Sequence, residues 1–72
     1  MFIEIDDKLI NLDNVTCIID LGFDGETDEG LVRICFASER DYIDIKREGD
    51  RAYCHFWCWL TKVCLRNAGE RE

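Results

Sequence analysis

Basic residues are few in this chain, and they are scattered along its length. Nine lysines and arginines stand against sixteen aspartates and glutamates, which gives a formal net charge of −7. Binding to a phosphate backbone needs clustered lysine and arginine side chains that displace counterions. The sequence therefore predicts no direct nucleic-acid binding. An acidic surface instead serves solubility, meets a basic protein partner, or imitates nucleic acid and blocks a protein that handles it.

Long apolar runs are absent as well. Residues 1–7 lack both a basic region and an extended apolar stretch, so we expect neither a signal peptide nor a membrane span. The expected location is therefore the cytoplasm. The five cysteines fit this expectation, because their number is odd and no export signal precedes them. In a reducing compartment we expect free thiols, which behave as small hydrophobic side chains.

A chain of 72 residues has room for a single domain, residues 1–72. A domain of this size buries only about 60% of the surface that its unfolded chain exposes. Such small scaffolds often gain the remaining stability from disulfides, a metal or oligomerisation. Hydrophobic residues make up 47% of the chain and charged residues 35%, a composition that indicates folding rather than disorder.

Alternating and β-branched stretches predict an antiparallel sheet over residues 1–46. The expected strands are residues 2–5, 8–12, 15–21, 31–37 and 41–46. Asp6 and Asp7 fit a hairpin turn between the first two strands. The glycine- and acid-rich segment 22–30 is expected to be a loop, and residues 38–40 a turn.

Side-chain alternation indicates which strand positions face the core. In the last two strands, Val32, Ile34, Phe36, Ile43 and Ile45 are expected to point inward.

The third strand is ambiguous in this respect. Either Cys17, Ile19 and Leu21 point inward, or a kink at residues 13–14 turns Ile18 inward instead.

From residue 51 the apolar period changes to about 3.6, which predicts an amphipathic helix over residues 51–66 with Asp50 as its N-cap. Residues 67–69 are expected to stop the helix and residues 67–72 to form a frayed tail. The inward arc of the helix is expected to hold Ala52, Phe56, Trp59, Leu60 and Val63, flanked by Tyr53, Trp57 and Cys64.

Together these elements predict an α+β fold: a five-stranded antiparallel meander with one C-terminal helix packed on one face. One helix covers only one face of such a sheet. The other face must be polar, or covered by a second copy or a partner.

An acidic cluster lies in the expected loop, at Asp24, Glu26, Asp28 and Glu29. The alternation of the first three resembles the opening of a calcium loop. The sixth position of such a loop is glycine, however, and Glu29 occupies it here. The sequence therefore favours a solvated hairpin loop.

Three helix residues, Cys54, His55 and Cys58, are candidates for a metal site. Two thiolates one helical turn apart suit zinc, but a structural site needs four ligands. Cys64 lies well away around the helix, and the chain has no C-x-x-C pair. We therefore predict no metal and no cofactor.

The same neighbours could suggest a thiol nucleophile paired with histidine. Adjacent helix positions, however, project about 100° apart. We therefore predict no enzymatic activity.

Apolar residues spread beyond the expected inward arc of the helix. Cys54, Cys58, Thr61 and Leu65 cluster on its outer side, with Trp57 at the border. A helix that is apolar over so much of its circumference is usually covered on more than one side, and exposed tryptophan is common at interfaces. These five positions are the expected interface, within a homodimer or larger homo-oligomer or with another protein.

The sequence also resembles a type of short bacterial and phage protein and is similar in layout to the small flagellar regulators of the FlbD family. Three segments carry the resemblance: Ile10-Asn11-Leu12-Asp13-Asn14-Val15, Tyr42-Ile43-Asp44-Ile45 and Phe56-Trp57-x-Trp59-Leu60. The resemblance implies a prokaryotic or viral origin. It assigns no activity and no functional residue.

Taken together, these features predict a non-enzymatic binding or regulatory module that acts through protein contacts. The alternative is an acidic inhibitor that uses Asp24, Glu26, Asp28 and Glu29 to imitate nucleic-acid charge.

Overall fold

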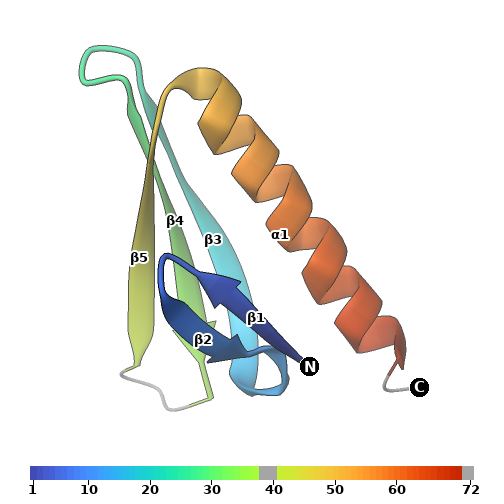
Figure 1. The fold of residues 1–72 in the computed structure, drawn as a ribbon. Helices are drawn as coiled ribbons and strands as arrows, with labels where there is room; N and C mark the ends of the chain where they lie inside the picture. Colours follow the sequence, from blue (N-terminus) through green and yellow to red (C-terminus); the bar gives the residue numbers. More distant parts are fainter. Residues whose placement is uncertain (38–40, 71–72) are drawn as a thin grey trace.

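The computed structural model describes residues 1–37 and 41–70. In these residues the chain forms strands β1 (Phe2–Ile5) and β2 (Lys8–Asn11), a short 3-10 helix η1 (Leu12–Asn14), strands β3 (Val15–Asp24), β4 (Glu29–Phe36) and β5 (Tyr42–Glu48), and helix α1 (Asp50–Glu70). The fold is therefore α+β (Figure 1). The turn expected at residues 38–40 lies outside the described residues.

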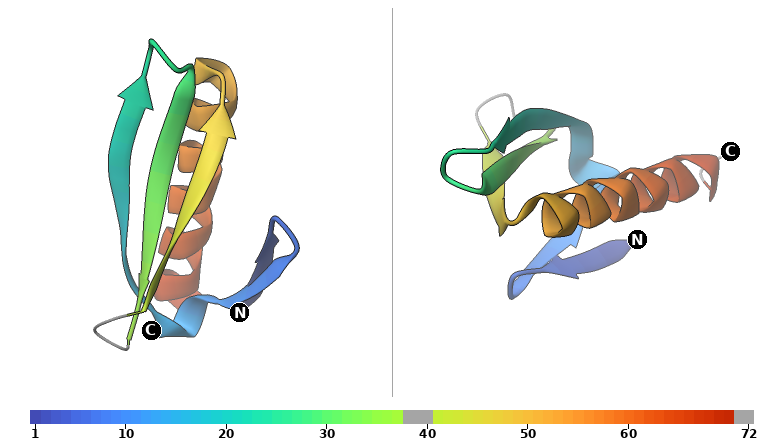
Figure 2. Two further views of the ribbon diagram at one scale, coloured as in Figure 1. Left: turned by 90° about the vertical axis from the view of Figure 1, so that its left-hand side faces the viewer. Right: turned by 90° about the horizontal axis from the view of Figure 1, so that it is seen from above.

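The described strands form two antiparallel sheets, so the expected single meander is wrong. Strands β1 and β2 make a hairpin, and β3, β4 and β5 make a separate sheet in that order. Figure 2 shows the hairpin standing apart from the three-stranded sheet. The chain bends at η1, where Asn11 accepts a 3.1 Å hydrogen bond from the Asp13 amide as the N-cap and Leu12 is buried. This bend lies between β2 and β3.

The hairpin itself forms as expected, with Ile5 opposite Lys8 across the turn. Asp6 and Asp7 both have positive φ angles, of 50° and 67°. Two such residues form the tight turn that matches the twist of paired strands, and aspartate tolerates this conformation better than most side chains.

Strand β3 is longer than the sequence indicated, and the loop after it is shorter. Phe23 pairs with Gly30 and Asp24 with Glu29, so only four residues separate β3 from β4. Ile18 packs against the core, whereas Cys17 and Ile19 are exposed. The structure therefore selects the kinked alternative for this strand.

One core cluster joins both sheets to the helix. Its buried members are Ile5, Ile10, Val32, Ile34, Ile45, Tyr53, Phe56 and Leu60. Helix α1 begins beside the end of β5 and runs obliquely, so that it is close to the sheet at its first turns and diverges from it towards its last (Figures 1 and 2).

The helix is set about its axis differently from the sequence-based expectation. Tyr53 is buried, whereas Ala52 is exposed and Trp59 is 42% exposed. At 100° per residue, the centre of the buried arc is therefore rotated by about 45° around the helix axis from the expected centre, towards Tyr53. Two contacts account for this setting: the Tyr53 ring lies against Gly30, and the Arg47 guanidinium lies 4.3 Å from the centre of the Phe56 ring.

The helix also continues beyond the expected end at residue 66, to Glu70. Asn67, assigned to a frayed tail, is instead buried in the last turns and donates a 3.3 Å hydrogen bond to the Asp13 carboxylate. The amino terminus lies 3.5 Å from the same carboxylate. Residues 71–72 of the expected tail lie outside the described residues.

Candidate interaction site

Four neighbouring helix residues form an uncharged surface, called here the helix strip: Cys54, Cys58, Thr61 and Leu65. Three are exposed, and Leu65 is 73% exposed. Thr61 is half-buried, and its hydroxyl donates a 2.9 Å hydrogen bond to the Cys58 carbonyl. This bond lies within the helix and satisfies the hydroxyl of Thr61 as a donor.

Trp57 does not lie with these residues on the exposed surface. It is half-buried and packs against the core cluster, so it borders the helix strip instead of standing out from it. Trp59, which was expected on the inward arc, is the more exposed tryptophan, because the contacts of Tyr53 and Phe56 set the helix rotation.

Opposite charges border the helix strip on its two sides. Asp50, whose carboxylate accepts a 3.6 Å hydrogen bond from the Cys54 thiol, lies on the side towards β3. Asp20 of β3 is near enough to act on Cys54 electrostatically. Arg51 and Lys62 follow on the other side, about 50–70° beyond the centre of the strip at 100° per residue.

The Cys54 thiol is held in its neutral form. Partial desolvation raises its pKa, and the negative charge of Asp50 raises it further. A protonated thiol is a poor nucleophile and a poor metal ligand, but it is a small apolar contact group. The chemistry of Cys54 therefore suits a contact surface.

The metal candidates Cys54, His55 and Cys58 are all exposed. Within residues 1–37 and 41–70, no group of three or more histidine, cysteine, aspartate or glutamate side chains is placed to hold a metal ion. His55 projects about 100° away from Cys54 around the helix.

The acidic residues form the tight connection between β3 and β4. The Asp24 carboxylate accepts a 2.9 Å hydrogen bond from the Glu26 amide, and Asp28 has a φ of 61°. Glu29 pairs with Lys46 of β5 at 3.5 Å. These contacts give the residues a role in turn formation, and Asp24, Glu26 and Asp28 remain exposed at the tip.

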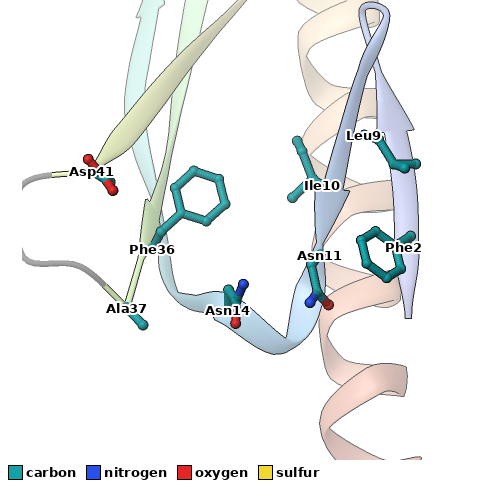
Figure 3. Close-up of a pocket in the computed structure, with 8 residues that line it drawn as sticks. All are labelled: Phe2, Leu9, Ile10, Asn11, Asn14, Phe36, Ala37 and Asp41. Atoms are coloured by element: carbon teal, nitrogen blue, oxygen red, sulfur yellow. The ribbon is translucent and has the colours of Figure 1, made fainter.

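A groove that the sequence did not indicate lies between the hairpin and the sheet. It has a volume of about 540 Å³. Ile10 and Phe36 point towards each other across it (Figure 3). Its lining is Phe2, Leu9, Ile10, Asn11, Asn14, Phe36, Ala37 and Asp41. Because the groove depends on the separation of the two sheets, no local pattern could have revealed it.

A second surface is the side of the β3–β5 sheet that faces away from α1, and it is called here the open face. Arg33 crosses it to Asp44 with two hydrogen bonds of 2.8 and 3.1 Å, and its guanidinium lies 4.2 Å from the Tyr42 ring centre. On the same face, Cys17 of β3 lies opposite Cys35 of β4. The face is thus neither wholly polar nor wholly apolar.

Comparisons with known proteins find no matching family model, and no significant match to a curated protein or to a solved structure. The resemblance in layout to the FlbD regulators stays a prediction. In the described part of the chain, no helix has the length and hydropathy that a membrane crossing requires.

Proposed function

We propose that this protein is a non-enzymatic binding module that acts through protein–protein contacts and forms a homodimer through the helix strip. The observation that supports this is the exposure of three apolar strip residues on one side of the helix, above all Leu65 at 73%. Cytoplasmic location is part of the same proposal.

A second copy of the chain is the favoured partner for the helix strip, because the strip is uncharged and its two borders carry opposite charges. The protein carries a net charge of −7, so repulsion between two copies is smallest where they meet at a neutral surface. In a twofold dimer whose axis runs along the helices, the two helices lie parallel. The Arg51 and Lys62 side of each strip then faces the Asp50 and Asp20 side of its partner.

The size of the surface fits this arrangement. The accessible surface of the protein is 5115 Å², whereas a compact monomer of this mass has about 4,650 Å². A helix of 21 residues is about 31 Å long. With its charged borders it offers an interface at the lower end of the usual range, about 600–800 Å² per partner.

Sedimentation equilibrium of the wild type and of two leucine variants tests the proposal. Leu65→Glu places a charge in the helix strip and is expected to weaken dimerisation at least about tenfold. Leu9→Glu is the matched control, because Leu9 is 72% exposed but lies on the hairpin. A monomeric wild type, or equal effects of the two variants, would contradict the proposal.

The second candidate is an acidic inhibitor of a nucleic-acid-handling protein. The observation that favours it is the exposure of Asp24, Glu26 and Asp28 together at the tip of the β3–β4 connection. Capture of a basic partner by charge mimicry would weaken steeply with salt. Replacement of these three residues with their amides would abolish such capture, and it would leave association through the helix strip intact.

A further inference from the structure

Cys17 and Cys35 face each other directly across the first two strands of the three-stranded sheet. They are register partners in β3 and β4, and both lie on the open face. Cys17 is exposed on the edge strand, and Cys35 is half-buried on the central strand. Thr16, next to Cys17, is an extra residue where the register shifts. The ladder is therefore interrupted at this point, and the backbone there can adjust.

The spacing of this pair suits a disulfide. Directly opposite residues in antiparallel strands have Cα atoms about 4.5–5.5 Å apart and Cβ atoms about 4.5–5.5 Å apart. A disulfide needs a Cα separation of about 4.4–6.8 Å and a Cβ separation of about 3.5–4.5 Å. A shift of about 1 Å at most closes the remaining gap, and the bulge at Thr16 provides room for it.

The helix cysteines are placed less favourably for forming a disulfide. Cys54 and Cys58 stand one turn apart, where Cβ atoms are about 5–6 Å from each other and are held by the helix. Cys64 packs against the core cluster from the inner side of α1.

The two sheet thiols also differ in chemistry. The pKa of Cys35 is raised, first by its hydrogen bond with the Cys17 thiol and then by desolvation. Cys35 therefore stays protonated. Cys17, at the exposed edge of the sheet, is accessible to a dissolved reagent. A reaction that begins at Cys17 and ends at Cys35 follows from this arrangement.

We propose that Cys17 and Cys35 form a thiol–disulfide exchange site that is oxidised by small soluble disulfides. The Cys17 thiolate attacks one sulfur of the small disulfide and releases one thiolate, which leaves a mixed disulfide on Cys17. Cys35 loses its proton to solvent and attacks the Cys17 sulfur, which displaces the second thiolate. One small disulfide is reduced to two thiols, and the protein dithiol is oxidised to one disulfide.

This site is independent of the proposed dimer, because the open face and the helix strip are on different elements. An exposed disulfide between neighbouring strands is accessible to thiols, so the oxidation is reversible. Disulfides of this kind in reducing compartments are usually transient and regulatory.

Oxidised glutathione is the probe, and intact mass with peptide mapping is the readout. The wild type is expected to lose the mass of two hydrogen atoms, with Cys17 linked to Cys35. Cys35→Ser is expected to stop at a glutathione adduct on Cys17, and Cys17→Ser to form no intramolecular link. Cys64→Ala, which lies outside the helix strip, is the control and is expected to react like the wild type.

The rate of ring closure adds a second readout. Decay of the mixed disulfide is expected to speed up about tenfold per pH unit, because the thiolate fraction of Cys35 rises by that factor below its pKa. A link between other cysteines, a mixed disulfide that persists in the wild type at high pH, or disulfides only between molecules would overturn the proposal. Sedimentation of the fully reduced protein keeps the dimer measurement separate from each of these results.

Discussion

The ring of Tyr53 occupies the space that a side chain at Gly30 would need. A Cβ atom built on Gly30 would lie 2.7 Å from both Cγ and Cε1 of that ring, and closer still to Cδ1. Tyr53 is only 6% exposed, and Phe23 contacts it from β3 with ring centres 5.9 Å apart. The missing side chain of Gly30 therefore creates the slot that fixes how the first turn of α1 is seated on the sheet.

Gly30→Ala is expected to destabilise the protein by about 1–3 kcal/mol, because the buried ring must move to admit the methyl group. Urea unfolding measures this change. Gly25→Ala is the matched control, since a Cβ there meets nothing within 4 Å. It should change stability by no more than about 0.5 kcal/mol. Equal effects of the two substitutions would show that the slot has no energetic role.

Tyr53→Phe is expected to leave stability unchanged or to raise it by up to about 1 kcal/mol. The Tyr53 hydroxyl is buried and has no hydrogen-bond partner among the described residues. The phenylalanine ring fills the same slot without a desolvated polar group. Thermal unfolding tests this, with Tyr42→Phe on the open face as the exposed control. A clear loss of stability in Tyr53→Phe alone would contradict the expectation.

Asn67→Ala is expected to cost about 1–2 kcal/mol, because it removes a part-buried hydrogen bond to the Asp13 carboxylate. The same bond ties the last turns of α1 to η1. Hydrogen exchange is therefore expected to speed up in the final turn of the helix and little elsewhere.

Ala68→Ser, on the exposed side of the same turn, is the control for the Asn67 substitution. Its expected cost is about 0.5 kcal/mol, from helix propensity alone. Unchanged exchange in Asn67→Ala would mean that the end of the helix is ordered by other contacts.

Acid is expected to weaken the ion pair on the open face. Hydrogen bonds from Arg33 hold the pKa of Asp44 below its usual value. A carboxylate with a lowered folded-state pKa contributes stability above its unfolded pKa, about 3.9, and this contribution is lost as pH falls through the folded value. Asp44→Asn should therefore make stability less dependent on pH between about pH 5 and pH 2.

Urea midpoints measured across that range are the readout for the Asp44 prediction. Arg33→Gln removes the other partner and is expected to flatten the acid limb in the same way. If both variants run parallel to the wild type at every pH, the ion pair does not contribute to stability.

The inward-facing positions of the strands were predictable because each strand buries one face, so buried and exposed residues alternate along it. Val32, Ile34 and Ile45 were expected to point inward and are buried. The hairpin turn at Asp6 and Asp7 followed in the same way from residue types that tolerate positive φ angles. Such features depend on a few neighbouring residues, and those neighbours are visible in the sequence.

The candidate site was predictable only in part. Cys54, Cys58 and Leu65 were expected on the outer side of the helix and are exposed there. Trp59 was expected to point inward and is 42% exposed, because periodicity gives the angles between helix residues but not the rotation of the whole helix. That rotation depends on contacts such as the Tyr53 ring against Gly30, which join residues from different elements.

The sequence by itself determined that this chain forms short antiparallel strands followed by one amphipathic helix, because alternation and 3.6-residue periodicity act over a few residues. Tertiary structure decided the separation of the hairpin from the sheet, the rotation of α1 and the pairing of Cys17 with Cys35. Each of these depends on how buried surfaces from distant segments fit together. The places where they are visible are the bulge at Thr16, the 3-10 helix η1 and the slot at Gly30.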